Sequence, residues 1–150
     1  MPRKPTVKQI NKDRLRQAIN DIEKSLIRLR QLGEVSLEEF LSNEDYQDIA
    51  RSRLLTAIEA SINMCYHIVA KKLGKVPQQY GQCFETLGAE GLIPPELAQK
   101  LSAMCKFRNR LVHMYWEIDY KVVYHIIHHH MQDLEQFINE VKKNITRGVL

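Results

Sequence analysis

The strongest constraint on the fold is the helical spacing of apolar residues along the chain. Between positions 7 and 31, five apolar residues are spaced 4, 3, 4 and 3 apart, which places them on one stripe of a helix. They are Leu15, Ile19, Ile22, Leu26 and Leu29. No stretch shows the alternation of apolar and polar residues that a half-buried strand requires. The sequence therefore predicts an all-α protein.

Further helices are predicted between the few prolines and glycines. The expected segments are 36–41, 42–74, a shorter helix from about 80 to Gly88 or Gly91, 94–108 and 119–145, the last as one continuous helix. Helices of this length joined by short loops pack as antiparallel neighbours. No linker or internal repeat divides the chain. The prediction is an up-and-down helical bundle that forms a single domain over residues 10–147.

The net charge of +4 at first suggests an anionic partner such as nucleic acid. The excess, however, lies in the first 12 residues, which contain Arg3, Lys4, Lys8 and Lys12 and no acidic residue. Without these four, the 22 basic residues fall to 18 and equal the 18 acidic ones. Residues 1–9 are therefore expected to form a basic tail on a neutral body.

Composition also indicates the compartment. No apolar run approaches the length of a membrane helix, and no apolar stretch follows the basic N-terminus as a secretory signal requires. Cys65, Cys83 and Cys105 lack metal-ligand spacing, which favours buried free thiols in a reducing cytosol. We therefore expect a cytoplasmic protein with no membrane partner, metal or cofactor.

One segment contains the residue types of a reactive site. Arg108, Asn109, His113 and Tyr115 fall within eight residues. Arginine binds phosphate oxygens through its planar fork and keeps its charge, and histidine exchanges protons near neutral pH. Metal-independent RNA cleavage needs both. A base takes the proton of the ribose 2′-hydroxyl, and a cation stabilises the charge that develops on the attacked phosphate.

The spacing sets a geometric condition on this site. At about 100° per residue, Asn109 and His113 share one face of a helix, whereas His113 lies about 140° from Arg108. Either the helix distorts near His113, or a second copy of the chain supplies the facing wall. A helix that continued would return Tyr115 to the Arg108 side. The residues alone are also consistent with a purely structural role, in which Arg108 is solvated, His113 caps a helix and Tyr115 packs against neighbouring side chains.

The segment from Arg108 to Val123 resembles the signature of the HepT-like toxin family of the HEPN superfamily. That signature is an arginine, four to six residues, a histidine, one residue and a tyrosine. Here Arg108, His113 and Tyr115 fit it without gaps. The likeness extends to flanking stretches at 36–41, 57–60 and 91–98 and covers roughly residues 10–145.

The resemblance implies a fold, an activity and a partner. HepT-like toxins are helical bundles that pair face to face as homodimers, and their two Arg-to-His segments meet in a cleft that cleaves RNA without a metal. It implies that Arg108 and His113 are catalytic and that Asn109 is a supporting contact. It also implies an MntA-like nucleotidyltransferase antitoxin that transfers adenylyl groups from ATP to Tyr115. An adenylate beside Arg108 and His113 would neutralise the phosphate site.

Two alternatives stay open at this point. Glu59, on the long middle helix, could support the site by holding Arg108 or orienting His113, or it could be a solvated acid. The expected function is an RNA endonuclease toxin of a type VII-like toxin–antitoxin system. The alternative is a non-catalytic HEPN-type module that binds a nucleotide or docks a nucleotidyltransferase partner through the same groove.

Overall fold

The computed structural model describes residues 9–150, and within that range it contains seven α-helices, one 3-10 turn and no strand. The helices are α1 (Lys12–Gly33), α2 (Leu37–Ser42), α3 (Glu44–Leu73), α4 (Tyr80–Ala89), α5 (Pro95–His113), α6 (Tyr120–His129) and α7 (Met131–Thr146), and the 3-10 turn η1 spans Tyr115–Glu117. The predicted all-α class is confirmed. The basic tail expected over 1–9 lies outside the described residues except at its last position.

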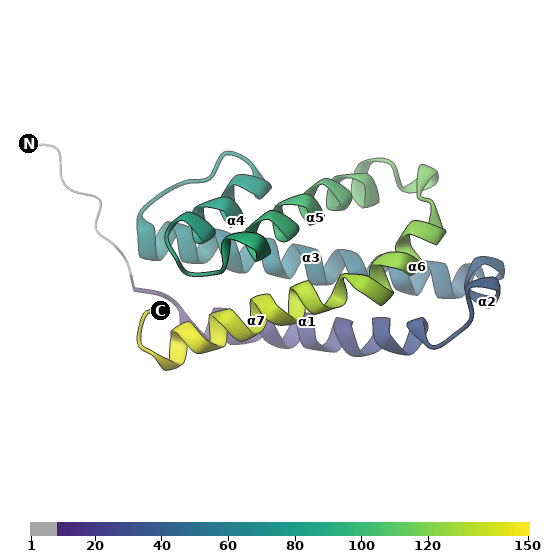
Figure 1. Cartoon of the computed structure of the whole chain (residues 1–150), viewed down its shortest axis with the longest axis horizontal. Coiled ribbons are helices and arrows are strands. Elements are labelled where there is room, and N and C mark those ends of the chain that lie inside the picture. Colours follow the sequence, from purple (N-terminus) through teal and green to yellow (C-terminus); the bar gives the residue numbers. More distant parts are fainter. Residues whose placement is uncertain (1–8) are drawn as a thin grey trace, which may run out of the picture.

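The long helices run up and down along one axis (Figure 1). α3 returns beside α1, α5 runs in the direction of α1, and α6 and α7 together return along the bundle (Figure 1). α1 packs most extensively on α3, and the short α4 packs on α5. The predicted up-and-down bundle is therefore confirmed. None of the described helices is long and apolar enough to cross a membrane.

Local sequence signals set most helix ends. The Ser36 side chain accepts a hydrogen bond from Glu39 N at the start of α2, and Asn43 accepts one from Tyr46 N at the start of α3. α3 ends at Gly74, whose φ of +64° is the left-handed conformation that glycine adopts without strain. Each of these caps lies within one residue of a boundary that the sequence predicts.

The core forms where the apolar stripes meet. All five stripe residues of α1 are buried, as predicted. α4 approaches α5 closely at Gly88, where an added Cβ would lie only 2.8 Å from the Cβ of Ala98. Because Gly88 has no side chain, α4 packs directly on Ala98 near the start of α5.

The predicted single helix over 119–145 is wrong, because the chain breaks at His130 (φ −120°, ψ −1°) into α6 and α7. Asp133 lies in the first turn of α7, where a carboxylate favours a helix start. It is buried and lies 3.2 Å from His130 Nδ1. The break leaves His130 half-exposed and brings Met131 into the core instead.

Candidate functional site

The predicted reactive segment lies across the C-terminal end of α5. Arg108 and Asn109 lie in its last turns, and His113 is its last helical residue. The chain leaves the helix at Met114 (φ −135°, ψ 38°), whose N–H donates to Arg110 O over 3.0 Å. Tyr115 then begins η1. Because the helix ends first, Tyr115 does not return to the Arg108 side as a continued helix would require.

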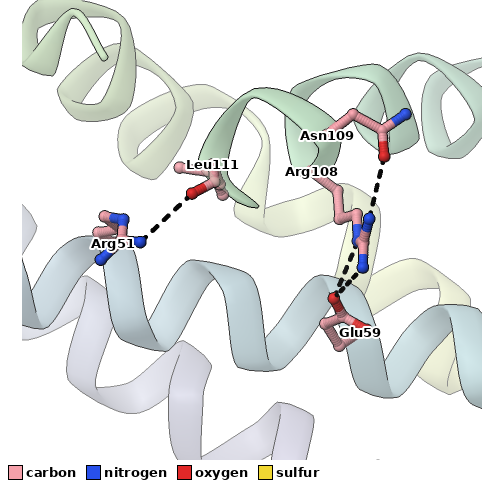
Figure 2. A network of polar contacts seen from close by, with 5 residues as sticks. All are labelled: Arg51, Glu59, Arg108, Asn109 and Leu111. Atoms are coloured by element: carbon pink, nitrogen blue, oxygen red, sulfur yellow. Dashed lines mark hydrogen bonds and ion pairs between the residues drawn. The ribbon is translucent and has the colours of Figure 1, made fainter. Parts of the chain in front are cut away.

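Arg108 is bound to α3 through Glu59. Its Nε donates to Glu59 Oε1 over 2.8 Å, and its Nη2 lies 2.8 Å from the same oxygen (Figure 2). Its Nη1 donates to Asn109 Oδ1 over 3.1 Å. The Arg108 side chain is 14% exposed and that of Glu59 37%. One edge of the guanidinium therefore faces Glu59, and the other faces Asn109.

Tyr80 forms a platform for the same guanidinium. Arg108 Cζ lies 4.9 Å from the centroid of the Tyr80 ring, within the range of a cation–π contact. The ring of Tyr66 on α3 packs edge-on against Tyr80, with the centroids 5.9 Å apart. Sequence reasoning missed Tyr80 as a site residue, since nothing in its local spacing connects it to a residue 28 positions later.

Arg51 connects α3 to the end of α5. Its Nη2 donates to the carbonyl of Leu111 over 3.4 Å (Figure 2), and its Cζ lies 5.0 Å from the centroid of the Tyr115 ring. Its buried Nε has no hydrogen-bond partner among the described residues. Tyr115 therefore packs against Arg51 instead of Arg108. Arg51 and Glu59 share one side of α3 at i and i+8, which is the only sequence signal that could have identified Arg51.

His113 and the residues after it form an exposed surface. His113 is exposed and makes no hydrogen bond or ion pair with Arg108 in the described part of the chain. Tyr115 is 55% exposed and Trp116 68%, and their rings pack edge to face with centroids 5.3 Å apart. Within one chain, Arg108 faces α3 whereas His113 faces solvent.

The cysteines are free and buried, as predicted. Cys105 lies one turn before Arg108, and burial raises the pKa of its thiol to about 12 although the Arg108 charge acts in the opposite direction. At neutral pH this thiol is therefore protonated and a poor nucleophile. No group of three or more His, Cys, Asp or Glu residues in the described ranges could hold a metal ion.

Comparison with known proteins gives these residues a family context. The family model described as ribonuclease HepT-like matches residues 15–141, which include every site residue named above. An mRNA nuclease HepT from Shewanella oneidensis is 33% identical over 104 residues, covering 69% of this chain and 78% of that protein. A tRNA nuclease HepT from Aphanizomenon flos-aquae is 31% identical over 114 residues, covering 75% of this chain and 77% of that protein.

A solved structure agrees with these matches. The fold resembles a tri-AMPylated HEPN toxin of Shewanella oneidensis in complex with an MNT antitoxin, with a TM-score of 0.80 and 31% identity. The match covers 87% of this chain and 98% of that one. On sequence and on fold, the chain belongs to the ribonuclease HepT-like family.

Proposed function

We propose that this chain is an RNA endonuclease toxin of a cytoplasmic toxin–antitoxin pair, with Arg108 and His113 as its catalytic residues. Two relatives that carry nuclease names, for mRNA and for tRNA, support the reaction class. The observation that carries the proposal is the setting of Arg108. Its guanidinium is fixed by Glu59 and Asn109, five residues before an exposed histidine at the end of the same helix.

The proposed reaction uses no metal. His113 takes the proton of the ribose 2′-hydroxyl, and the 2′-oxygen forms a bond to the adjacent phosphorus. Arg108 stabilises the added negative charge through its Nη1 edge on the Asn109 side. The bond from phosphorus to the 5′-oxygen then breaks, and that oxygen takes up a proton from solvent. The products are a 2′,3′-cyclic phosphate and a 5′-hydroxyl.

The site is proposed to form between two protomers. Arg108 faces α3 and His113 faces solvent, so one chain does not present both groups to one phosphate. A face-to-face homodimer brings His113 of one protomer opposite Arg108 of the other. Met114 and Trp116 provide exposed apolar surface for such a contact.

The test is RNA cleavage by purified protein in the presence of EDTA. We expect His113→Ala to abolish cleavage, while its helical circular dichroism spectrum and melting temperature match those of the parent. His125→Ala is the matched control, because His125 is an exposed histidine on α6 away from the motif. A His113→Ala protein that cuts RNA as fast as the parent would refute the assignment.

One observation favours the non-catalytic alternative. Within one chain Arg108 and His113 do not face each other, so a single protomer would bind phosphate without cleaving RNA. Titration of ATP and single-stranded RNA against the purified protein with EDTA separates the two functions. A binding module retains RNA or ATP and yields no cleaved strand, whereas the toxin yields fragments that end in cyclic phosphate.

Regulation by an MntA-like nucleotidyltransferase antitoxin is part of the proposal. The related toxin solved with its MNT antitoxin is tri-AMPylated, and Tyr115 in this chain is exposed enough to be modified. Incubation with the cognate antitoxin and ATP should add adenylyl mass to the peptide that contains Tyr115. Tyr115→Phe should lose this uptake and Tyr120→Phe should keep it, whereas equal uptake by all three proteins contradicts the assignment.

A further inference from the structure

A polar cavity of about 550 Å³ lies between the start of α4 and the middle of α5. Its α4 side includes three glutamines, at positions 78, 79 and 82, together with Tyr80 and Glu85. α5 contributes Ser102, whose hydroxyl donates to Glu85 Oε1, and also Lys106 and Asn109. The volume is within the range of pockets that bind small organic ligands. Arg108, His113 and Tyr115 do not line it, but Tyr80 and Asn109, which both contact Arg108, do, so the cavity adjoins the proposed catalytic residues.

The cavity leads directly to the proposed catalytic residues. Ser102, Lys106, Asn109 and His113 are spaced 4, 3 and 4 residues apart, so they lie on one stripe of α5. Lys106 is exposed and lies seven residues before His113, or about 10 Å along the helix axis. Asn109 links the two regions, because it lines the cavity and its Oδ1 accepts from Arg108 Nη1 over 3.1 Å.

The lining has the hydrogen-bonding chemistry of a base-reading site. Each glutamine or asparagine amide offers donors and an acceptor side by side, which matches the edge of an unpaired nucleobase. Gln82 Oε1 accepts from Gln78 N over 3.0 Å, so its NH₂ end is left to donate. Gln79 is the N-cap residue of α4, and its side chain makes no capping bond there. Figure 2 shows the Asn109 amide nitrogen pointing away from Arg108.

We propose that this cavity binds the nucleobase of an RNA nucleotide that flanks the cleaved phosphate. Gln79 and Gln82 read the hydrogen-bonding edge of the base, and the exposed ammonium of Lys106 contacts the phosphate of the same strand. The cavity then sets the sequence preference of the nuclease, whereas Arg108 and His113 act on any phosphodiester. The inference rests on the proposed ribonuclease function and adds substrate specificity to it.

The test compares cleavage-site preferences on a pool of single-stranded RNA with randomised sequence. The parent should prefer one class of base at a fixed position beside the cleaved bond. Gln79→Ala and Gln79→Ala/Gln82→Ala should reduce that preference about tenfold or more while RNA is still cut. Lys106→Ala should raise KM equally for all sequences and weaken its salt dependence. Gln136→Ala, an exposed glutamine on α7, is the matched control and should behave as the parent.

The outcomes separate this inference from the proposed function. Gln82→Ala removes the hydrogen bond that Gln82 Oε1 accepts from Gln78 N. Gln79→Ala breaks no side-chain hydrogen bond among the described residues, so this single substitution tests the base site without disturbing the start of α4. A parent that cuts no RNA overturns the proposed function. The base site alone is overturned by a parent that cuts RNA without base preference. It is also overturned by Gln79→Ala proteins, with or without Gln82→Ala, that keep the preference of the parent or lose rate equally on every sequence.

Discussion

Arg108 Nε donates to Glu59 Oε1 over 2.8 Å, although 49 residues separate the two in the chain. The ion pair joins the end of α5 to the middle of α3 and fixes one edge of the guanidinium. Glu59 therefore binds Arg108, and it makes no hydrogen bond or ion pair with His113 among the described residues. In the proposed mechanism Glu59 is therefore a positioning residue for the catalytic arginine.

Glu59→Gln should lower the rate of RNA cleavage about 10- to 100-fold. Arg108 would keep its charge, but without the carboxylate it would be poorly oriented toward the phosphate. The pair is partly exposed, so folding should lose on the order of 1 kcal/mol or less. Initial cleavage rates and urea unfolding measure the two effects. Glu23→Gln is the control, since Glu23 forms a comparable surface pair with Lys142. Equal rates for the parent and Glu59→Gln would remove Glu59 from the site.

Arg51→Lys should slow adenylyl uptake at Tyr115 by about tenfold. Lysine keeps the charge but loses the planar group that stacks on the Tyr115 ring and bonds Leu111 O. Intact-protein mass spectrometry during incubation with the antitoxin and ATP follows the reaction. Arg53→Lys, an exposed arginine two residues further along α3, should react like the parent. Equal rates of adenylyl uptake by Arg51→Lys and Arg53→Lys would show that Arg51 does not position Tyr115.

Acidification should destabilise the fold through His67. This histidine is buried, and its Nε2 accepts a hydrogen bond from Asn11 N, the cap of α1, over 3.0 Å. Burial, with smaller contributions from Arg14 and Lys71, lowers its pKa below 6.5. Between that lowered pKa and 6.5, the unfolded chain binds a proton that the folded chain does not, so the free energy of unfolding rises with pH. The stability that His67 contributes is fully present above about pH 6.5.

The measurement is urea unfolding at pH 5.5, 6.5 and 7.5. His67→Gln, which does not titrate, should flatten the dependence between pH 5.5 and 6.5, and the exposed His125→Gln should leave it as in the parent. A parent whose unfolding free energy is constant over this range shows that His67 protonates equally in both states.

Removal of residues 1–9 takes away Arg3, Lys4 and Lys8. RNA binding should weaken modestly, and the slope of log K against log salt concentration should fall by at most about 2, because each phosphate contact to a single strand contributes about 0.7. The rate of cleavage at saturating RNA should stay unchanged. Anisotropy titrations at several salt concentrations test this, with a chain carrying glutamine at the three positions as a length-matched control. An unchanged slope shows that the tail does not contact RNA.

The sequence predicted the features that depend on neighbours along one helix. The apolar spacing of α1 predicted its buried face, and Ser36, Asn43 and Gly74 indicated helix boundaries. Both could be predicted because periodicity and capping are local effects. The Arg108, His113 and Tyr115 motif was equally visible, since it lies within eight residues. The break at His130 was missed because no proline or glycine signals it.

Only the tertiary structure decided which residues surround the motif. Glu59 and Arg51 lie on one side of α3, yet the first binds Arg108 and the second binds Leu111 O and packs on Tyr115. Tyr80 reaches Arg108 from α4. These contacts depend on how far each helix rotates and slides against its neighbour, and many packed residues set that together. A sequence therefore determines which face of a helix is buried, whereas only the packed bundle determines what that face meets.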